Sequence, residues 1–184
     1  MNKNNDNQSE QGEYIEFNQE TNAIDYLKKV LCFLKSIESK PENWKWVAIS
    51  LHGALYGFAI CSLRGTNNCS VSKDNGNLIK FDEALKRSQE DEYMQMYQNS
   101  RTLEITGREK QSILTMKDLL RNNFQHFIPK TWAIEISGMP TVTRDCIRVI
   151  EFLALETNNF QHHLSEEQKK KIESIIKNIR EILN

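Results

Sequence analysis

The chain has 184 residues, of which 39% are hydrophobic and 27% are charged, a balance that suits one globular domain with its own core. Seven glycines and three prolines are too few for a turn-rich β-sandwich or β-barrel. The net charge of −1 excludes a global basic field for gripping long duplex nucleic acid, but it leaves room for a small basic site.

The four cysteines form no C-x-x-C pair, which favours reduced thiols in a cytoplasmic protein, mostly filling core positions. They are Cys32, Cys61, Cys69 and Cys146. A zinc site would have to combine some of these thiols with His162 and His163, and the spacing matches no common ligand pattern. We therefore expect no bound metal.

Residues 1–20 are rich in Asn, Gln and Glu and lack the basic and apolar regions of a secretion signal. We expect a disordered or loosely ordered N-terminal arm there, followed by a helical domain over residues 21–184. The first helix is predicted over residues 22–38, where apolar side chains recur at helical spacing. Pro41 then suits the first turn of a second helix.

Residues 42–64 are the most apolar stretch, and the 17 residues from Val47 to Leu63 approach the length of a membrane span. The stretch also contains Ser50, His52 and two glycines, and there is no second apolar span. A helix that is apolar nearly all round is typical of the centre of a bundle, so we expect no membrane attachment. The alternative, a membrane-attached protein, predicts that the chain pellets with membranes.

The middle of the chain predicts a surface loop over residues 65–79, a shorter helix over 80–96 and a connection over 97–105. A long helix is predicted over residues 106–127. Thr106 and Glu109 have the spacing of a capping box at its start. Its apolar row consists of Met116, Leu120, Phe124 and Phe127, and Pro129 follows its end.

Beyond Pro129, residues 131–140 are expected to be extended or irregular, and a helix is predicted over residues 140–157. A turn is expected over residues 158–163. Ser165 and Gln168 then form a second capping-box pattern, which opens a last amphipathic helix. The whole pattern predicts an all-α fold, a bundle of five to six helices.

A polar cluster lies beside the apolar row of the helix predicted over residues 106–127: Arg121, Asn122, Asn123 and His126. At about 100° per residue, Asn122 and His126 lie one turn apart and point the same way. Arg121 lies about 140° from His126, so only its length brings its head to the same point. Asn123 falls within the apolar sector, where a buried amide needs partners or faces another subunit.

This residue combination can do phosphate chemistry. A histidine of near-neutral pKa transfers protons at pH 7, and an arginine holds a phosphate or a developing oxyanion. The structural alternative is an exposed Arg121 and a His126 that interacts with the end of its own helix, where a cation is favoured by the helix dipole.

The segment RNNFQH, from Arg121 to His126, resembles the signature of the HEPN family, an arginine followed at four to six residues by a histidine, frequently with a polar residue after the arginine. An earlier apolar helix bearing a polar residue, here WVAISLHGALYGF, is also similar to that family. The resemblance covers roughly residues 22–157 at the level of helix order.

The resemblance implies a small helical bundle that forms a homodimer, bringing two Arg/His motifs together across a two-fold axis. Many members are metal-independent ribonucleases that act as toxins or in phage defence, without a cofactor. The implied roles are general base or acid for His126, stabilisation of negative charge for Arg121, and orientation of the histidine or phosphate for Asn122. An antitoxin protein would then be a partner. The alternative is a non-catalytic member that binds a nucleotide, RNA or a protein.

His52 is a further candidate, because the family often carries a supporting polar residue on the earlier apolar helix. The alternative is a neutral core histidine satisfied by its own hydrogen bonds. His162 and His163 adjoin in a turn and are expected to be solvated. The three consecutive lysines of residues 169–171 lie beside Glu166, Glu167 and Glu173, which predicts a solvated helix face rather than a nucleic-acid patch.

Overall fold

The computed structural model describes residues 13–64, 69–95, 97–125, 129, 131 and 133–184. Within these residues the fold is all α-helical, as the sequence predicts, and the extended structure amounts to an isolated bridge between Ser72 and Leu78. Residues 1–12 of the expected N-terminal arm lie outside the described residues. Residues 13–18 have no regular secondary structure and are exposed, with Tyr14 88% accessible, and the first helix begins at Gln19.

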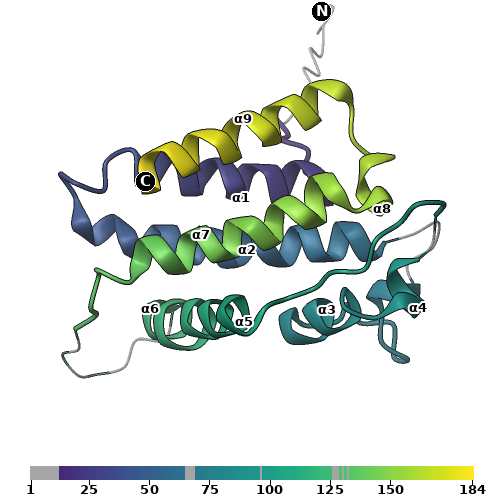
Figure 1. Ribbon diagram of the computed structural model, residues 1–184, viewed down its shortest axis with the longest axis horizontal. Helices are drawn as coiled ribbons and strands as arrows, with labels where there is room; N and C mark the ends of the chain where they lie inside the picture. Colours follow the sequence, from purple (N-terminus) through teal and green to yellow (C-terminus); the bar gives the residue numbers. More distant parts are fainter. Residues whose placement is uncertain (1–12, 65–68, 96, 126–128, 130, 132) are drawn as a thin grey trace, which may run out of the picture.

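The helices stack in three layers (Figure 1). The first layer holds α1 (Gln19–Leu34) and α9 (Glu166–Leu183). The second holds α2 (Trp44–Leu63) and α7 (Met139–Glu151). The third holds α3 (Phe81–Arg87), α4 (Asp91–Met94), α5 (Gly107–Leu114) and α6 (Asn122–Gln125). Because α1, α7 and α3 all pack on α2, the core is organised around that central helix.

Helix α2 follows a 3₁₀ turn, Pro41–Asn43, and its apolar side chains are buried on several sides. In the described part of the chain, Pro41–Leu63 is the stretch long and apolar enough to cross a membrane, with a mean hydropathy of 1.5. In its most apolar 18 residues, 67% are buried inside the protein, as in the core helix of a bundle. Its buried Ser62 hydroxyl donates to the carbonyl oxygens of Phe58 and Leu153, both at 2.8 Å.

The predicted first helix, 22–38, is displaced toward the N-terminus. The Asn18 side chain accepts the backbone N–H of Thr21 at 2.7 Å, and the Thr21 hydroxyl oxygen accepts the N–H of Asn18 at 3.1 Å. This reciprocal cap starts α1 at Gln19. The apolar stripe of the prediction, including Leu27 and Val30, is fully buried.

The helix predicted over residues 80–96 is wrong as one continuous element, because α3 ends at Arg87 and α4 begins at Asp91. The backbone carbonyl of Ser88 accepts the N–H of Leu103 at 2.9 Å, so it bonds the later connecting segment instead of continuing a helix. The connection over residues 97–105 is therefore tied to the end of α3.

Both long helices after residue 105 contain π-helical segments that the regular 3.6-residue period did not predict. The first helix runs as α5, a π segment at Thr115–Arg121, and α6. The second runs as α7, a π segment at Phe152–Glu156, and the short α8 (Asn158–Gln161) where a turn was expected. A π-helical segment carries an extra residue per turn and is frequent at functional sites.

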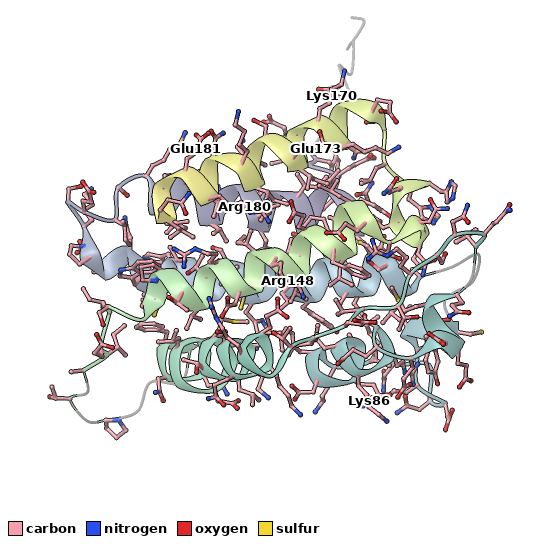
Figure 2. All side chains as sticks on the ribbon, in the orientation of Figure 1. Lys86, Arg148, Lys170, Glu173, Arg180 and Glu181 are labelled. Atoms are coloured by element: carbon pink, nitrogen blue, oxygen red, sulfur yellow. The ribbon has the colours of Figure 1, made fainter. Side chains whose placement is uncertain are left out.

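Both predicted capping boxes are confirmed. At α5, Glu109 accepts the Thr106 N–H at 2.9 Å while the Thr106 hydroxyl accepts the Glu109 N–H at 3.3 Å. At α9, Ser165 and Gln168 make the same reciprocal pair. Figure 2 labels Lys170, Glu173 and Glu181, three of the charged side chains spread along the exposed side of α9.

The cysteine prediction holds for two of the four residues. Cys61 and Cys146 are buried, whereas Cys32 and Cys69 are exposed. Burial raises the pKa of the Cys61 thiol to about 12, so this side chain is a neutral, core-filling group at pH 7. His162 and His163 are exposed, as predicted for a turn.

Candidate functional site

A cleft of about 730 Å³ opens beside α2, between α1 on one side and the π segment Thr115–Arg121 on the other. The start of α3 and the loop before it close one end. The described residues that line the cleft are Gln19, Asn22, Tyr26, Ile49, His52, Gly53, Tyr56, Gly57, Ile60, Leu78, Lys80, Phe81, Asp82, Lys117, Asp118, Arg121 and Asn122. Its size lies within the range of about 300–1,000 Å³ that is typical of small-ligand sites.

The π segment places two cationic side chains on this cleft. Met116 and Leu120 of the predicted apolar row are buried against the core, while Lys117 and Arg121, four residues apart, line the cleft. Their spacing of four fits the wide turn of a π-helix as well as it fits an α-helix. Core packing and cleft chemistry therefore occupy different sides of the same segment.

Arg121 and Asn122 are directly bonded to each other. The Nη1 of Arg121 donates to Oδ1 of Asn122 at 2.6 Å, and Nδ2 of Asn122 lies 3.4 Å from Oδ1 of Asp118. The Nε of Arg121 is buried and has no hydrogen-bond partner among the described residues. A buried donor left unsatisfied costs roughly 1–3 kcal/mol, so a ligand oxygen that accepted a hydrogen bond from this Nε would be stabilised.

Lys117 supplies a second cation. Its Nζ lies 2.9 Å from Oδ1 of Asp82 and 3.3 Å from Oδ1 of Asp118, and its side chain is only 17% exposed. The hydrogen bond that Lys117 donates to Asp82 is the largest cause that raises the pKa of Lys117, so the ammonium stays charged at pH 7. Lys117 thereby ties the start of α3 to the π segment.

His52 of α2 lies in the same cleft, stacked on Phe81 with ring centroids 4.4 Å apart and an angle of 23° between the planes. The pKa of His52 is lowered from 6.5 to about 4. Burial is the largest cause, the charges of Arg121 and Lys117 add to it, and the charge of Asp82 opposes it. The imidazole is therefore neutral at pH 7, where it can donate one hydrogen bond and accept another.

The loop that closes the cleft is fixed by Tyr56. Its hydroxyl donates to the backbone carbonyl of Ile79 at 2.5 Å, and its ring meets Phe81 edge-on at 6.2 Å. Because Phe81 also stacks on His52, the loop, α3 and α2 are held as one wall of the cleft. This wall is built largely before a ligand enters, as is usual for small-molecule sites.

The structure brings together three of the residues singled out from the sequence, because His52, Arg121 and Asn122 all line the cleft. Asn123 is partly buried and is not among the lining residues. His126 lies outside the described residues, so its predicted position one turn after Asn122 stays a prediction.

Sequence reasoning missed Lys117 and Tyr26. Lys117 could have been found from the sequence, since it lies four residues before Arg121 on a predicted helix. Tyr26 reaches the cleft only through the packing of α1 on α2. Among the lining side chains, Lys80, Lys117 and Arg121 are cationic and Asp82 and Asp118 anionic. The cleft is therefore slightly positive although the whole chain carries a net charge of −1.

A second cleft, of about 790 Å³, lies over α5 and α7 and is lined by paired charges. The buried Asp145 accepts two hydrogen bonds from Arg108, at 2.9 and 3.0 Å, and one from the Ser112 hydroxyl at 2.7 Å. Arg148, labelled on α7 in Figure 2, pairs with the buried Glu109. These pairs join α5 to α7, and this structural role is enough to explain why charged side chains line the second cleft.

The described residues contain no group of three His, Cys, Asp or Glu side chains placed to hold a metal ion. Comparisons with known proteins add no family. No family model, no curated protein and no solved structure matches this chain. The cleft must therefore be interpreted from its own chemistry.

Proposed function

We propose that this protein binds single-stranded RNA through a phosphate at Arg121 and cleaves it as a metal-independent endoribonuclease of HEPN type. The supporting observation is the meeting of Arg121, Asn122 and His52 at one cleft, from segments far apart in the sequence. The unsatisfied Nε of Arg121 and the nearby ammonium of Lys117 give that cleft two donors suited to an anion. A phosphate oxygen would satisfy the arginine donor once the side chain turns toward the ligand.

The reaction is the attack of a ribose 2′-oxygen on the adjacent phosphorus. The bond from phosphorus to the 5′-oxygen breaks, and a cyclic phosphate and a free 5′-hydroxyl result. The proton of the 2′-hydroxyl goes to a general base, and the leaving oxygen receives a proton from a general acid. His126 serves one of these roles, Arg121 stabilises the extra negative charge, and Asn122 orients the guanidinium to which it is bonded.

His52 has a supporting role in this scheme. Its pKa of about 4 leaves it neutral, so it is a hydrogen-bonding group rather than a cation at pH 7. A bound phosphate would offset the charges of Arg121 and Lys117, both of which lower the pKa of His52. Ligand binding should therefore raise the pKa of this imidazole.

The low pKa of His52 favours a second candidate, a non-catalytic nucleotide-, RNA- or protein-binding module. A general base is most efficient when its pKa lies near the working pH, so at pH 7 His52 is a poor substitute for His126 as proton acceptor. If His126 plays no part in chemistry, Arg121 and Lys117 still provide a phosphate-binding cleft. The two candidates share the ligand and differ in turnover.

The family resemblance adds a homodimer that pairs two Arg/His motifs and a role as toxin or defence effector held in check by an antitoxin. The cysteines, which form no C-x-x-C pair, add a cytoplasmic location. Sedimentation of the purified chain tests the dimer. If the chain is a monomer at micromolar concentration, the predicted pairing of two Arg/His motifs across a dimer interface is wrong.

Cleavage of single-stranded RNA in the presence of a metal chelator tests the enzyme. The wild type should cut, His126→Ala and Arg121→Ala should lose activity by about 100-fold or more, and His163→Ala, an exposed histidine on a turn, should cut normally. Binding without cleavage by the wild type would select the non-catalytic module. Equal cleavage by His126→Ala and the wild type would remove the catalytic assignment.

A further inference from the structure

The cleft has a second wall that the phosphate chemistry does not use. Figure 1 shows α1 and α6 on opposite sides of α2. Helix α1 contributes Gln19, Asn22 and Tyr26, at spacings of three and four, so these side chains lie on one face of the helix. The wall opposite Arg121 is therefore aromatic and amide-bearing, without a charged side chain from α1.

The Tyr26 ring lies directly against Gly53 of α2. A Cβ at position 53 would come within 2.6 Å of Cδ1, 2.7 Å of Cε1 and 2.8 Å of Cγ of Tyr26. Since glycine is a poor helix former, its presence in the middle of α2 has a specific explanation: the ring occupies the space of a side chain. Gly57, one turn later, packs instead against Ala23, and a Cβ at position 57 would lie 2.8 Å from the Cβ of Ala23.

This seat leaves part of Tyr26 exposed, 37% of the residue, and the exposed part lines the cleft. Asn22 lies one turn before it and is also exposed, with an amide that can both donate and accept. The neighbouring Gln19 already uses its Oε1 to accept from Arg64 at 2.8 Å. Of the two amides on this wall, Asn22 is thus the one better placed to hydrogen-bond a ligand that lies on the Tyr26 ring.

We propose that Tyr26 and Asn22 form a nucleobase subsite, in which the ring stacks on a base and the amide hydrogen-bonds the edge of that base. The inference rests on the proposed function, since it takes the phosphate of the same nucleotide to lie at Arg121. Aromatic side chains on which unpaired bases stack, with polar groups at the base edge, are the general means by which proteins bind single-stranded RNA. The alternative is that Tyr26 only fills the contact between α1 and α2.

The experiment measures binding of two short fluorescent oligomers to the full-length His126→Ala protein, which should not cut them. One is a single-stranded RNA, and the other is the same sugar-phosphate chain without bases. The base-bearing oligomer should bind about tenfold tighter or more. Tyr26→Ala should abolish that ratio, and Tyr26→Phe, which keeps the ring, should retain it.

Gly53→Ala is the second variant, because its methyl group must displace the Tyr26 ring; it should lower the ratio without removing the tyrosine. Gly107→Ala, at the start of α5, is its control, since a methyl group there meets no atom within 4 Å and Gly107 does not line the cleft. Using the ratio of the two affinities cancels any general loss of folded protein. A ratio unchanged by Tyr26→Ala and by Gly53→Ala would overturn the subsite.

The proposed function fails in a different way. If Arg121→Ala does not weaken binding of the baseless oligomer, or if neither oligomer binds the folded protein, the phosphate site itself is wrong. If both oligomers bind equally through Arg121, the phosphate site stands and the base subsite is overturned.

Discussion

The charge of Arg121 acts on the His52 ring, because both side chains line one cleft and the guanidinium lowers the pKa of the imidazole. Burial is the larger cause, and Lys117 adds to it, bringing the pKa to about 4. The cleft thus holds a neutral imidazole close to two cations, and an anion that binds these cations should raise the pKa of the imidazole.

The first prediction is a pH dependence of stability. The pKa of His52 is about 4 in the folded protein and 6.5 for an unperturbed histidine, so the unfolded chain binds more protons between these values. Stability should therefore fall as pH decreases from 6.5 toward 4, by at most about 3 kcal/mol from this group. Denaturant titrations across this range measure the loss.

Two variants separate His52 from the other titrating groups. His52→Gln should flatten this part of the pH profile. Arg121→Ala should raise the pKa of His52, which NMR titration of the ring protons can follow. An imidazole that titrates at 6.5 in the wild type would show that the ring is neither buried nor near the cations.

The second prediction concerns the anion that neutralises Lys117. Asp82→Asn removes a carboxylate 2.9 Å from the Lys117 ammonium, and it should strengthen RNA binding several-fold and steepen the salt dependence of the affinity. Asp82 is 72% exposed, so the stability cost of losing the pair should stay below about 1 kcal/mol. Fluorescence anisotropy at two salt concentrations measures the affinity.

The matched control for Asp82 is Glu173→Gln, which removes one negative charge from the exposed side of α9. It should change RNA affinity much less than Asp82→Asn does. Equal effects of the two variants would mean that only net charge matters and that the cleft is not where the RNA binds.

The helices were predictable because their signals are local. The capping boxes of Thr106 with Glu109 and Ser165 with Gln168 are read from residues three apart, and both are present. The π segments were not predictable, since the sequence analysis used the regular 3.6-residue period of an α-helix. The carbonyl of Leu153, in the second π segment, accepts the Ser62 hydroxyl of α2 at 2.8 Å, a contact that residue spacing does not reveal.

The residues of the cleft divide in the same way. Arg121 and Asn122 were found because they belong to one local polar cluster that resembles the HEPN signature, and His52 because that family often carries a polar residue on its earlier apolar helix. Nothing in the sequence singled out Tyr26. Its place in the cleft follows from Gly53, whose missing side chain admits the ring, and this is a property of the packed pair of helices.

The third prediction concerns α2 and membranes. Since 67% of its most apolar 18 residues are buried inside the bundle, the folded full-length protein should not float with lipid vesicles. Denaturant-treated protein, in which the helix is exposed, serves as the comparison. Flotation of the folded chain would indicate that α2 leaves the core, which would also dismantle the cleft built on it.

The last prediction separates the second cleft from the first. Asp145→Ala removes the acceptor of three hydrogen bonds that join α5 to α7, while Arg108, 65% exposed, can return to water. The cost should be about 1–3 kcal/mol, which lowers the melting temperature by several degrees. Because Asp145 is absent from the lining of the Arg121 cleft, the folded variant should bind RNA as the wild type does. Normal stability combined with lost RNA binding would mean that the paired arginines of the second cleft, rather than Arg121, hold the phosphate.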